Sequence, residues 1–218
     1  MTMGRFQNLW NGQLYLYGVL VLLSIAGTLL VLHRTAEYGV GLNTSDAVNY
    51  LSAARSFANG NGYLMATGEV FQVWPPLFPT LLGAPTVVDI DPLTTGRYLN
   101  ALAFGFTILL AGVWLSNNVE HRALVVIGTL SLFLAEPLVR ISSLFRSEPV
   151  YIVFTLLLGM SMSRFLADQN RRSLGLAILW AALATMQRTI GMSLNANTVS
   201  LVAWITVKLA FTGGWAGA

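Results

Sequence analysis

The sequence predicts an all-α integral membrane protein, a single domain of residues 1–218 with about six transmembrane helices and a long helical segment between the first two. Three observations support this fold class. Of the 218 residues, 55% are hydrophobic and only 10% are charged, whereas a soluble domain has about 25% charged residues. The mean hydropathy is +0.65. The apolar residues gather in runs that approach the roughly 20 residues needed to cross a bilayer.

The charges and the lack of cysteine exclude several classes of protein. The net charge of +3 rests on eleven arginines and one lysine, Lys208, which are scattered singly or in pairs. Because no basic patch forms, nucleic acid is not an expected partner. The absence of cysteine excludes disulfides, thiolate catalysis and cysteine-ligated metals.

The first predicted span runs from Leu14 to Leu32. It carries Tyr15 and Tyr17 near its start, where aromatic residues suit a membrane interface. A cleaved signal peptide is the alternative interpretation. The apolar run is too long for one, and no small-residue cleavage site follows it. We therefore expect a retained membrane anchor.

Five further apolar runs predict the remaining spans. They are Tyr98–Ser116, Ala123–Val139, Val150–Leu166, Leu174–Met186 and Thr198–Phe211. The second and fourth of these five are short, so they would need tilt, a thinner bilayer or burial among neighbouring helices. Glu136 lies within an apolar run and, because charge is costly in lipid, should face protein or water.

The positive residues decide the orientation only weakly. With the N-terminus placed inside, the total of Lys and Arg residues is the same on the two sides of the membrane. The one cluster, formed by Arg164, Arg171 and Arg172, lies in a short loop that should be cytoplasmic, which favours an inside N-terminus and a multi-pass topology.

Residues 35–96 form a segment too long for a simple connection. Asn43-Thr44-Ser45 offers helix N-caps, and a helical pattern runs from Asp46 through Ala58. Asp46 and Tyr50 are four residues apart, so they share one face of this helix. The turn residues Asn59-Gly60-Asn61-Gly62 end it.

The second half of this segment predicts a helix that lies in the membrane interface. Pro75 and Pro76 stand where a helix would begin, and an apolar, aromatic-flanked run continues to Leu82. Asp89-Ile-Asp-Pro then caps the next span. We expect the segment to lie outside the membrane on the external side.

The order of several short motifs resembles a family of membrane enzymes. After the anchor come Ser45-Asp46-x-x-x-Tyr50, Gly60-x-Gly62-Tyr63 and Trp74-Pro75-Pro76-Leu77-x-Pro79. This order is similar to the first external loop of GT-C fold glycosyltransferases that use polyprenyl-phosphate sugars, such as lipid A aminoarabinose transferases and protein O-mannosyltransferases. Arg146-Ser147-Glu148-Pro149 and Ala184-Thr-Met-Gln-Arg188-Thr-Ile-Gly191 resemble later external motifs. The resemblance covers about residues 10–192, the N-terminal half of such enzymes.

The resemblance implies transfer of a sugar, with inversion, from a polyprenyl phosphate to an acceptor hydroxyl at the outer face of a bacterial or archaeal cell membrane. Such a reaction needs a carboxylate for the acceptor proton and cations for the departing phosphate. Asp46 is the implied base, and Tyr50 would help to place a substrate. The family often has two adjacent acids where this chain has Ser45-Asp46. A divalent metal is therefore left open, and no other cofactor is implied.

Arg146, Glu148 and Arg188 complete the implied site. The fork of donors on a guanidinium group matches phosphate oxygens, and Glu148 would orient Arg146 or the acceptor. Each residue also has a simpler interpretation. Asp46 and Glu148 would be favourable first-turn acids, worth about 0.3 to 1 kcal/mol, and the arginines, including Arg140, would extend toward lipid headgroups.

Two interpretations of the whole chain remain open, because it is shorter than the transferases it resembles. It is either a small or partial transferase, or a non-catalytic scaffold subunit of a larger membrane complex. Expected partners are membrane lipid, a polyprenyl-phosphate-linked sugar, and either other subunits or a second copy of the chain. Contact with another chain would use the small residues around Gly105 and Gly112, or those at Ala177, Ala181 and Ala184.

Overall fold

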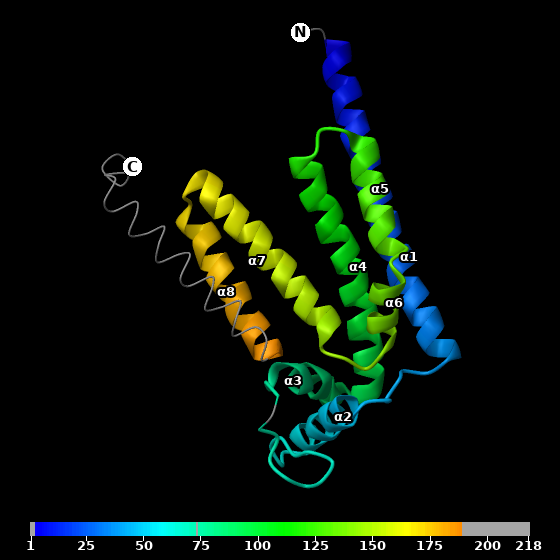
Figure 1. Ribbon diagram of the computed structural model, residues 1–218, viewed down its shortest axis with the longest axis vertical. Coiled ribbons are helices and arrows are strands. Elements are labelled where there is room, and N and C mark those ends of the chain that lie inside the picture. The colour runs from blue at the N-terminus through cyan, green and yellow to red at the C-terminus, as the bar shows by residue number, and fades with distance from the viewer. Residues whose placement is uncertain (1–2, 73, 189–218) are drawn as a thin grey trace.

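The computed structural model describes residues 3–72 and 74–188, and all regular structure within these ranges is helical (Figure 1). The long helices stand side by side, and a layer of short helices lies across one end of them (Figure 1). Two isolated bridges, Gly41 with Leu144 and Leu64 with Val70, add local pairing without forming a strand in the described residues. The expectation of an all-α protein is confirmed.

Three helices are long and apolar enough to cross a membrane. They are the 13–37 part of α1 (Met3–Glu37), α4 (Pro92–Asn118) and α7 (Glu148–Asp168). The predicted spans 14–32, 98–116 and 150–166 fall within them. Half of the most apolar stretch of α4 is buried inside the chain, against 22% for α1 and 28% for α7. Helix α4 is therefore the central helix, packed between α1 and α7.

The predicted continuous span at 123–139 is wrong in one respect, since the helix breaks. Helix α5 (Arg122–Phe133) ends and α6 (Glu136–Ser143) begins at a bend of 46°. Pro137 explains the break, because a proline ring clashes with the carbonyl four residues earlier, here that of Phe133, and lacks an N–H. The pair forms either a broken span or a re-entrant loop, so the described residues hold three candidate spans, or four with this pair.

Helix α8 (Arg171–Gln187) contains the predicted run 174–186. Its 17 residues extend about 25 Å, short of the roughly 30 Å of a bilayer core. It packs along α7, where Ala177 and Ala181 contact a cluster formed by Leu158, Met162 and Phe165. The last predicted span, Thr198–Phe211, lies outside the described residues.

The small-residue faces expected to bind another chain are used inside this one. A Cβ at Gly105 would collide with the Thr28 hydroxyl, and Ser24 Oγ donates a hydrogen bond of 2.8 Å to the Gly105 carbonyl, so α1 and α4 meet closely here. A Cβ at Gly112 would lie 2.7 Å from Leu20. Ala177, Ala181 and Ala184 on α8 are also buried. The expectation of partner contacts at these faces was wrong, because small residues serve helix pairing within a chain equally well.

The layer across the end of the long helices is formed by the part of the chain that follows α1 and precedes α4. It contains α2 (Ser45–Ala58), α3 (Leu77–Gly83) and the 3₁₀-helix η1 (Ala84–Val88). Thr44 is the N-cap of α2 and accepts a hydrogen bond of 3.2 Å from the Ala47 N–H. Helix α3 begins directly after Pro76. Asp91 caps α4, because its side chain accepts a hydrogen bond of 2.8 Å from the Leu93 N–H. These caps confirm the predicted helix starts. The layer is shorter than 35–96, because α1 continues to Glu37 and α4 begins at Pro92.

An aromatic cluster holds this layer against the long helices. Phe78 on α3 is fully buried. Its ring centroid lies 5.1 Å from that of Tyr50 on α2 and 6.0 Å from that of Phe145, which precedes α7. Trp74 and Phe71 pack on Tyr50 from the adjoining loop. The cluster therefore fixes one face of α2 beside the start of α7.

Candidate functional site

The five candidate residues come from three elements that meet at the end of the bundle covered by α2 and α3 (Figure 1). Asp46 and Tyr50 lie on α2. Arg146 and Glu148 lie at the start of α7, and Arg188 directly follows the end of α8. The fold thus gathers residues that are far apart in the sequence.

Glu148 joins the two arginines through one oxygen atom. Its Oε1 lies 2.6 Å from Arg188 Nη1 and 3.3 Å from Arg146 Nη1. About a quarter to a third of each side chain is exposed, at 23% for Glu148, 34% for Arg146 and 33% for Arg188. The three side chains form a partly buried cluster with a formal charge of +1, in which both guanidinium groups point at one anionic position.

Two residues that the sequence analysis missed connect this cluster to α2. The Tyr50 hydroxyl lies 3.4 Å from Ser147 Oγ, and the Ser147 carbonyl accepts a hydrogen bond of 3.2 Å from Gln187 Nε2. Both Ser147 and Gln187 are fully buried. Their only signal in the sequence is that each lies next to a motif arginine. Through these contacts Ser147, at the start of α7, connects Tyr50 on α2 with Gln187 on α8.

The Tyr50 hydroxyl is subject to burial and to several charges of the site. Burial raises the pKa of Tyr50 above its ordinary 10.0, the Ser147 hydrogen bond and the charge of Arg188 oppose this rise, and the carboxylates of Asp46 and Glu148 add to it. The net effect is a raised pKa, so the phenol keeps its proton at neutral pH and serves as a hydrogen-bond donor or acceptor. The charges of Asp46, Glu148 and Arg188 all influence this one hydroxyl.

Asp46 lies in the first turn of α2 and is exposed, one turn before Tyr50. Ser45 Oγ donates a long hydrogen bond of 3.4 Å to its Oδ1. Within residues 3–72 and 74–188, no group of three or more His, Cys, Asp or Glu side chains is placed to hold a metal ion. The donor set around Asp46 does not fit a divalent metal, and we derive no step through one.

Two buried polar atoms in the site have no hydrogen-bond partner among the described residues. They are Arg146 Nε, a donor, and Gln187 Oε1, an acceptor. Leaving such a group unpaired costs about 1 to 3 kcal/mol, so these atoms mark positions where a polar ligand or a water molecule would be favourable.

Arg140 does not join this site. It lines a separate cavity of about 650 Å³ between the end of α1 and α6, whose lining includes several charged side chains. In the same cavity Arg34 Nη1 lies 3.3 Å from Glu136 Oε2. Glu136 therefore faces a protein cation in this cavity, in keeping with the cost of a charge in lipid.

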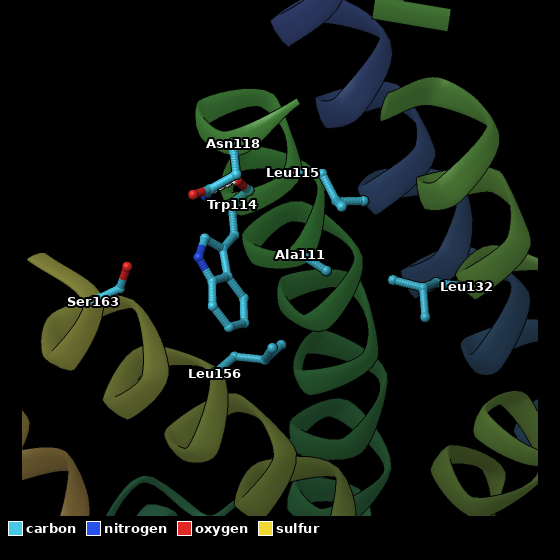
Figure 2. A pocket seen from close by; sticks show the side chains of 7 residues that line it. All are labelled: Ala111, Trp114, Leu115, Asn118, Leu132, Leu156 and Ser163. Carbon is cyan, nitrogen blue, oxygen red and sulfur yellow. Dashed lines mark hydrogen bonds between the residues drawn. The ribbon is translucent and has the colours of Figure 1, made fainter. Parts of the chain in front are cut away.

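An apolar cavity of about 470 Å³ lies farther along the long helices (Figure 2). Its walls include Ala111 and Trp114 on α4, Leu132 on α5, and Leu156 and Ser163 on α7. The Trp114 indole lies between α4 and α7 (Figure 2). Leu156 and Ser163 follow Glu148 by 8 and 15 positions, which is about 12 to 22 Å along a helix.

Comparison with known proteins finds no matching family model, curated protein or solved structure. The function must therefore be argued from the chemistry of the site.

Proposed function

We propose that this chain is a membrane glycosyltransferase of the GT-C type, which moves a sugar from a polyprenyl phosphate to an acceptor hydroxyl. The observation that carries the proposal is the convergence of two arginines, Arg146 and Arg188, on a single anionic position, while the charges of Asp46, Glu148 and Arg188 all influence the Tyr50 hydroxyl. Paired guanidinium groups of this kind suit a phosphate group, and a nearby carboxylate suits a hydroxyl that must lose its proton.

The reaction follows from these roles. The acceptor oxygen attacks the anomeric carbon of the sugar while Asp46 takes the acceptor proton. The bond between the anomeric carbon and the phosphate oxygen breaks, and its electron pair leaves with that oxygen. Because attack and departure occur on opposite faces in one step, the anomeric configuration inverts. The products are the glycosylated acceptor and a polyprenyl phosphate.

The arginines stabilise the departing group. A donor phosphodiester carries one negative charge, and the released phosphate gains a second as the bond breaks. Cations already placed around that oxygen favour the transition state over the ground state, because they need no rearrangement as the charge develops. In this proposal Tyr50, with its proton retained, would donate a hydrogen bond to a substrate oxygen.

The proposed membrane arrangement completes the site. We place the N-terminus inside, six spans in the membrane, and the layer of α2 and α3 on the outer side, where a lipid-linked sugar would meet its acceptor. The polyprenyl chain would run along α4 and α7 toward the apolar cavity around Trp114. This keeps the charged head of the donor at the membrane surface and its tail in the hydrocarbon.

Lysine in place of either arginine tests the phosphate site. Arg146→Lys or Arg188→Lys keeps the charge but loses the forked donor geometry, so we expect binding of a polyprenyl phosphate to weaken about tenfold for each, a loss of roughly 1.4 kcal/mol. Titration of the full chain in detergent micelles measures this. Arg164→Lys, on an exposed side chain at the far end of α7, is the matched control. Unchanged affinity in both site variants would favour headgroup contacts instead.

A scaffold subunit is the second candidate function. Glu148 pairs with both arginines and so connects the start of α7 to the end of α8 without any ligand. Such a network can serve to hold helices in place. Helix α5 also exposes Leu124 and Ile127, at 55% and 59%, an apolar face that either lipid or another subunit could cover.

The mass of the intact particle separates the two functions. Extraction in a mild detergent followed by native mass measurement should give, for a scaffold, a stoichiometric complex with unlike subunits that transfers no sugar. For the transferase we expect sugar transfer by this chain alone or by a complex of its own copies. A stable and active monomer would exclude the scaffold.

A further inference from the structure

Glu148 has a second role that follows from its place between the arginines, if the proposed function holds. We infer that its carboxylate is an internal counterpart of the donor phosphate, and that the two exchange on the same pair of guanidinium groups. Phosphate binding would then release Glu148, and phosphate departure would restore its contacts.

The geometry defines one anionic position rather than two separate ion pairs. Arg146 reaches it from just before α7 and Arg188 from just after α8, and each directs its Nη1 at the same oxygen, Glu148 Oε1, at 3.3 and 2.6 Å. Carboxylate and phosphate oxygens accept hydrogen bonds from guanidinium with the same geometry. A phosphate oxygen in this position would meet donors that are already oriented toward it.

The charges of the site favour exchange over simultaneous binding. With Glu148 in contact, the two arginines offer a net charge of +1; with Glu148 displaced they offer +2. The dianionic phosphate of the released lipid matches the second state. If Glu148 stayed in contact, its carboxylate and the phosphate would be two like charges at one position, which is unfavourable.

The local structure lets Glu148 leave. It is the first residue of α7, and its side chain is 23% exposed, so it can turn toward water without unwinding the helix. Ion pairs between partly exposed side chains are individually weak. Arg146 Nε, buried and without a partner, offers a further donor that the carboxylate does not use. An incoming phosphate would gain a hydrogen bond that Glu148 does not make.

Glu148→Gln tests the exchange, since glutamine keeps the shape and removes the competing charge. We expect this variant of the full chain, in detergent micelles, to bind a polyprenyl monophosphate roughly 3- to 30-fold tighter than the unmodified chain, the effect of removing two partly exposed ion pairs. The increase in affinity caused by Glu148→Gln should be smaller for a singly charged phosphodiester. Glu136→Gln makes the same change in a separate carboxylate–arginine pair, with Arg34, and should leave the affinity unchanged.

Each of the following results would overturn the inference. If the unmodified chain binds the phosphate but Glu148→Gln binds it equally or less well, Glu148 holds the arginines in place and no exchange occurs, while the proposed function stands. If the double variant Glu148→Gln with Arg188→Lys keeps the full gain, the competition does not act through Arg188. If the unmodified chain binds no phosphate and neither lysine variant differs from it, the proposed function itself fails.

A second variant, with a shorter side chain, tests the exchange even if the glutamine variant does not fold. Glu148→Asp keeps the charge but withdraws the carboxylate from both guanidinium groups, so it should also tighten binding. Unchanged or weaker binding in a folded Glu148→Asp protein would contradict the exchange.

Discussion

Asp46→Asn should lower the rate of sugar transfer by about two to four orders of magnitude, the usual contribution of a general base. Asparagine keeps the size of the side chain but cannot accept the acceptor proton. The phosphate site lies on other elements, so donor binding should change little. Single-turnover transfer from a labelled polyprenyl-phosphate sugar, measured beside donor titration, separates these two effects.

The control for Asp46 must show that the loss is not structural. Asp89→Asn makes the same change at an exposed position in the same layer, where the residue has a left-handed φ of 61° that asparagine tolerates well. As a first-turn acid alone, Asp46 would contribute only about 0.3 to 1 kcal/mol to helix stability. Near-normal transfer in Asp46→Asn would leave only that helix-stabilising role.

Phe78→Ala should destabilise the layer of α2 and α3 by about 3 to 5 kcal/mol, as expected for removal of a fully buried phenylalanine. The Phe78 ring contacts Tyr50 on one side and Phe145 on the other. Its loss leaves a cavity between α2 and the start of α7. Hydrogen exchange at the amides of α2 should therefore quicken by on the order of 10² to 10³-fold, since each 1.4 kcal/mol is tenfold.

Phe106→Ala is the matched control, because Phe106 is 52% exposed on α4. Its removal leaves no internal cavity, so exchange in α2 should stay as in the unmodified chain. If Phe78→Ala also leaves α2 protected, the layer is held by contacts other than the aromatic cluster.

The two predictions are linked by position. Tyr50 reaches Ser147, just before α7, because α2 packs there, and Phe78 belongs to the same packed cluster; Asp46 lies one turn before Tyr50 on the same helix. Phe78→Ala should therefore reduce transfer as well as stability, although no atom of Phe78 would touch a substrate. A variant that loses protection in α2 but keeps full transfer would remove Asp46 from the mechanism.

Much of the helical framework could be predicted from local patterns. The apolar runs at 14–32, 98–116 and 150–166 coincide with candidate spans, because hydropathy and length depend only on neighbouring residues. The caps at Thr44 and Asp91 and the helix after Pro76 were equally visible. The break before Glu136 has a local cause in Pro137, although the apolar residues around it indicate one continuous span.

The sequence by itself determined the helical class, the stretches of chain that form the apolar helices and the identity of the ionisable residues near the helix ends. Only the tertiary structure decided which of them meet. Nothing local places Arg188 against Glu148, and nothing local assigns Gly105 to the contact with α1 rather than to another chain. The physical reason is that lipid and a neighbouring helix are about equally apolar. The apolar pattern of a membrane helix therefore does not show which of its faces contacts lipid and which contacts another helix.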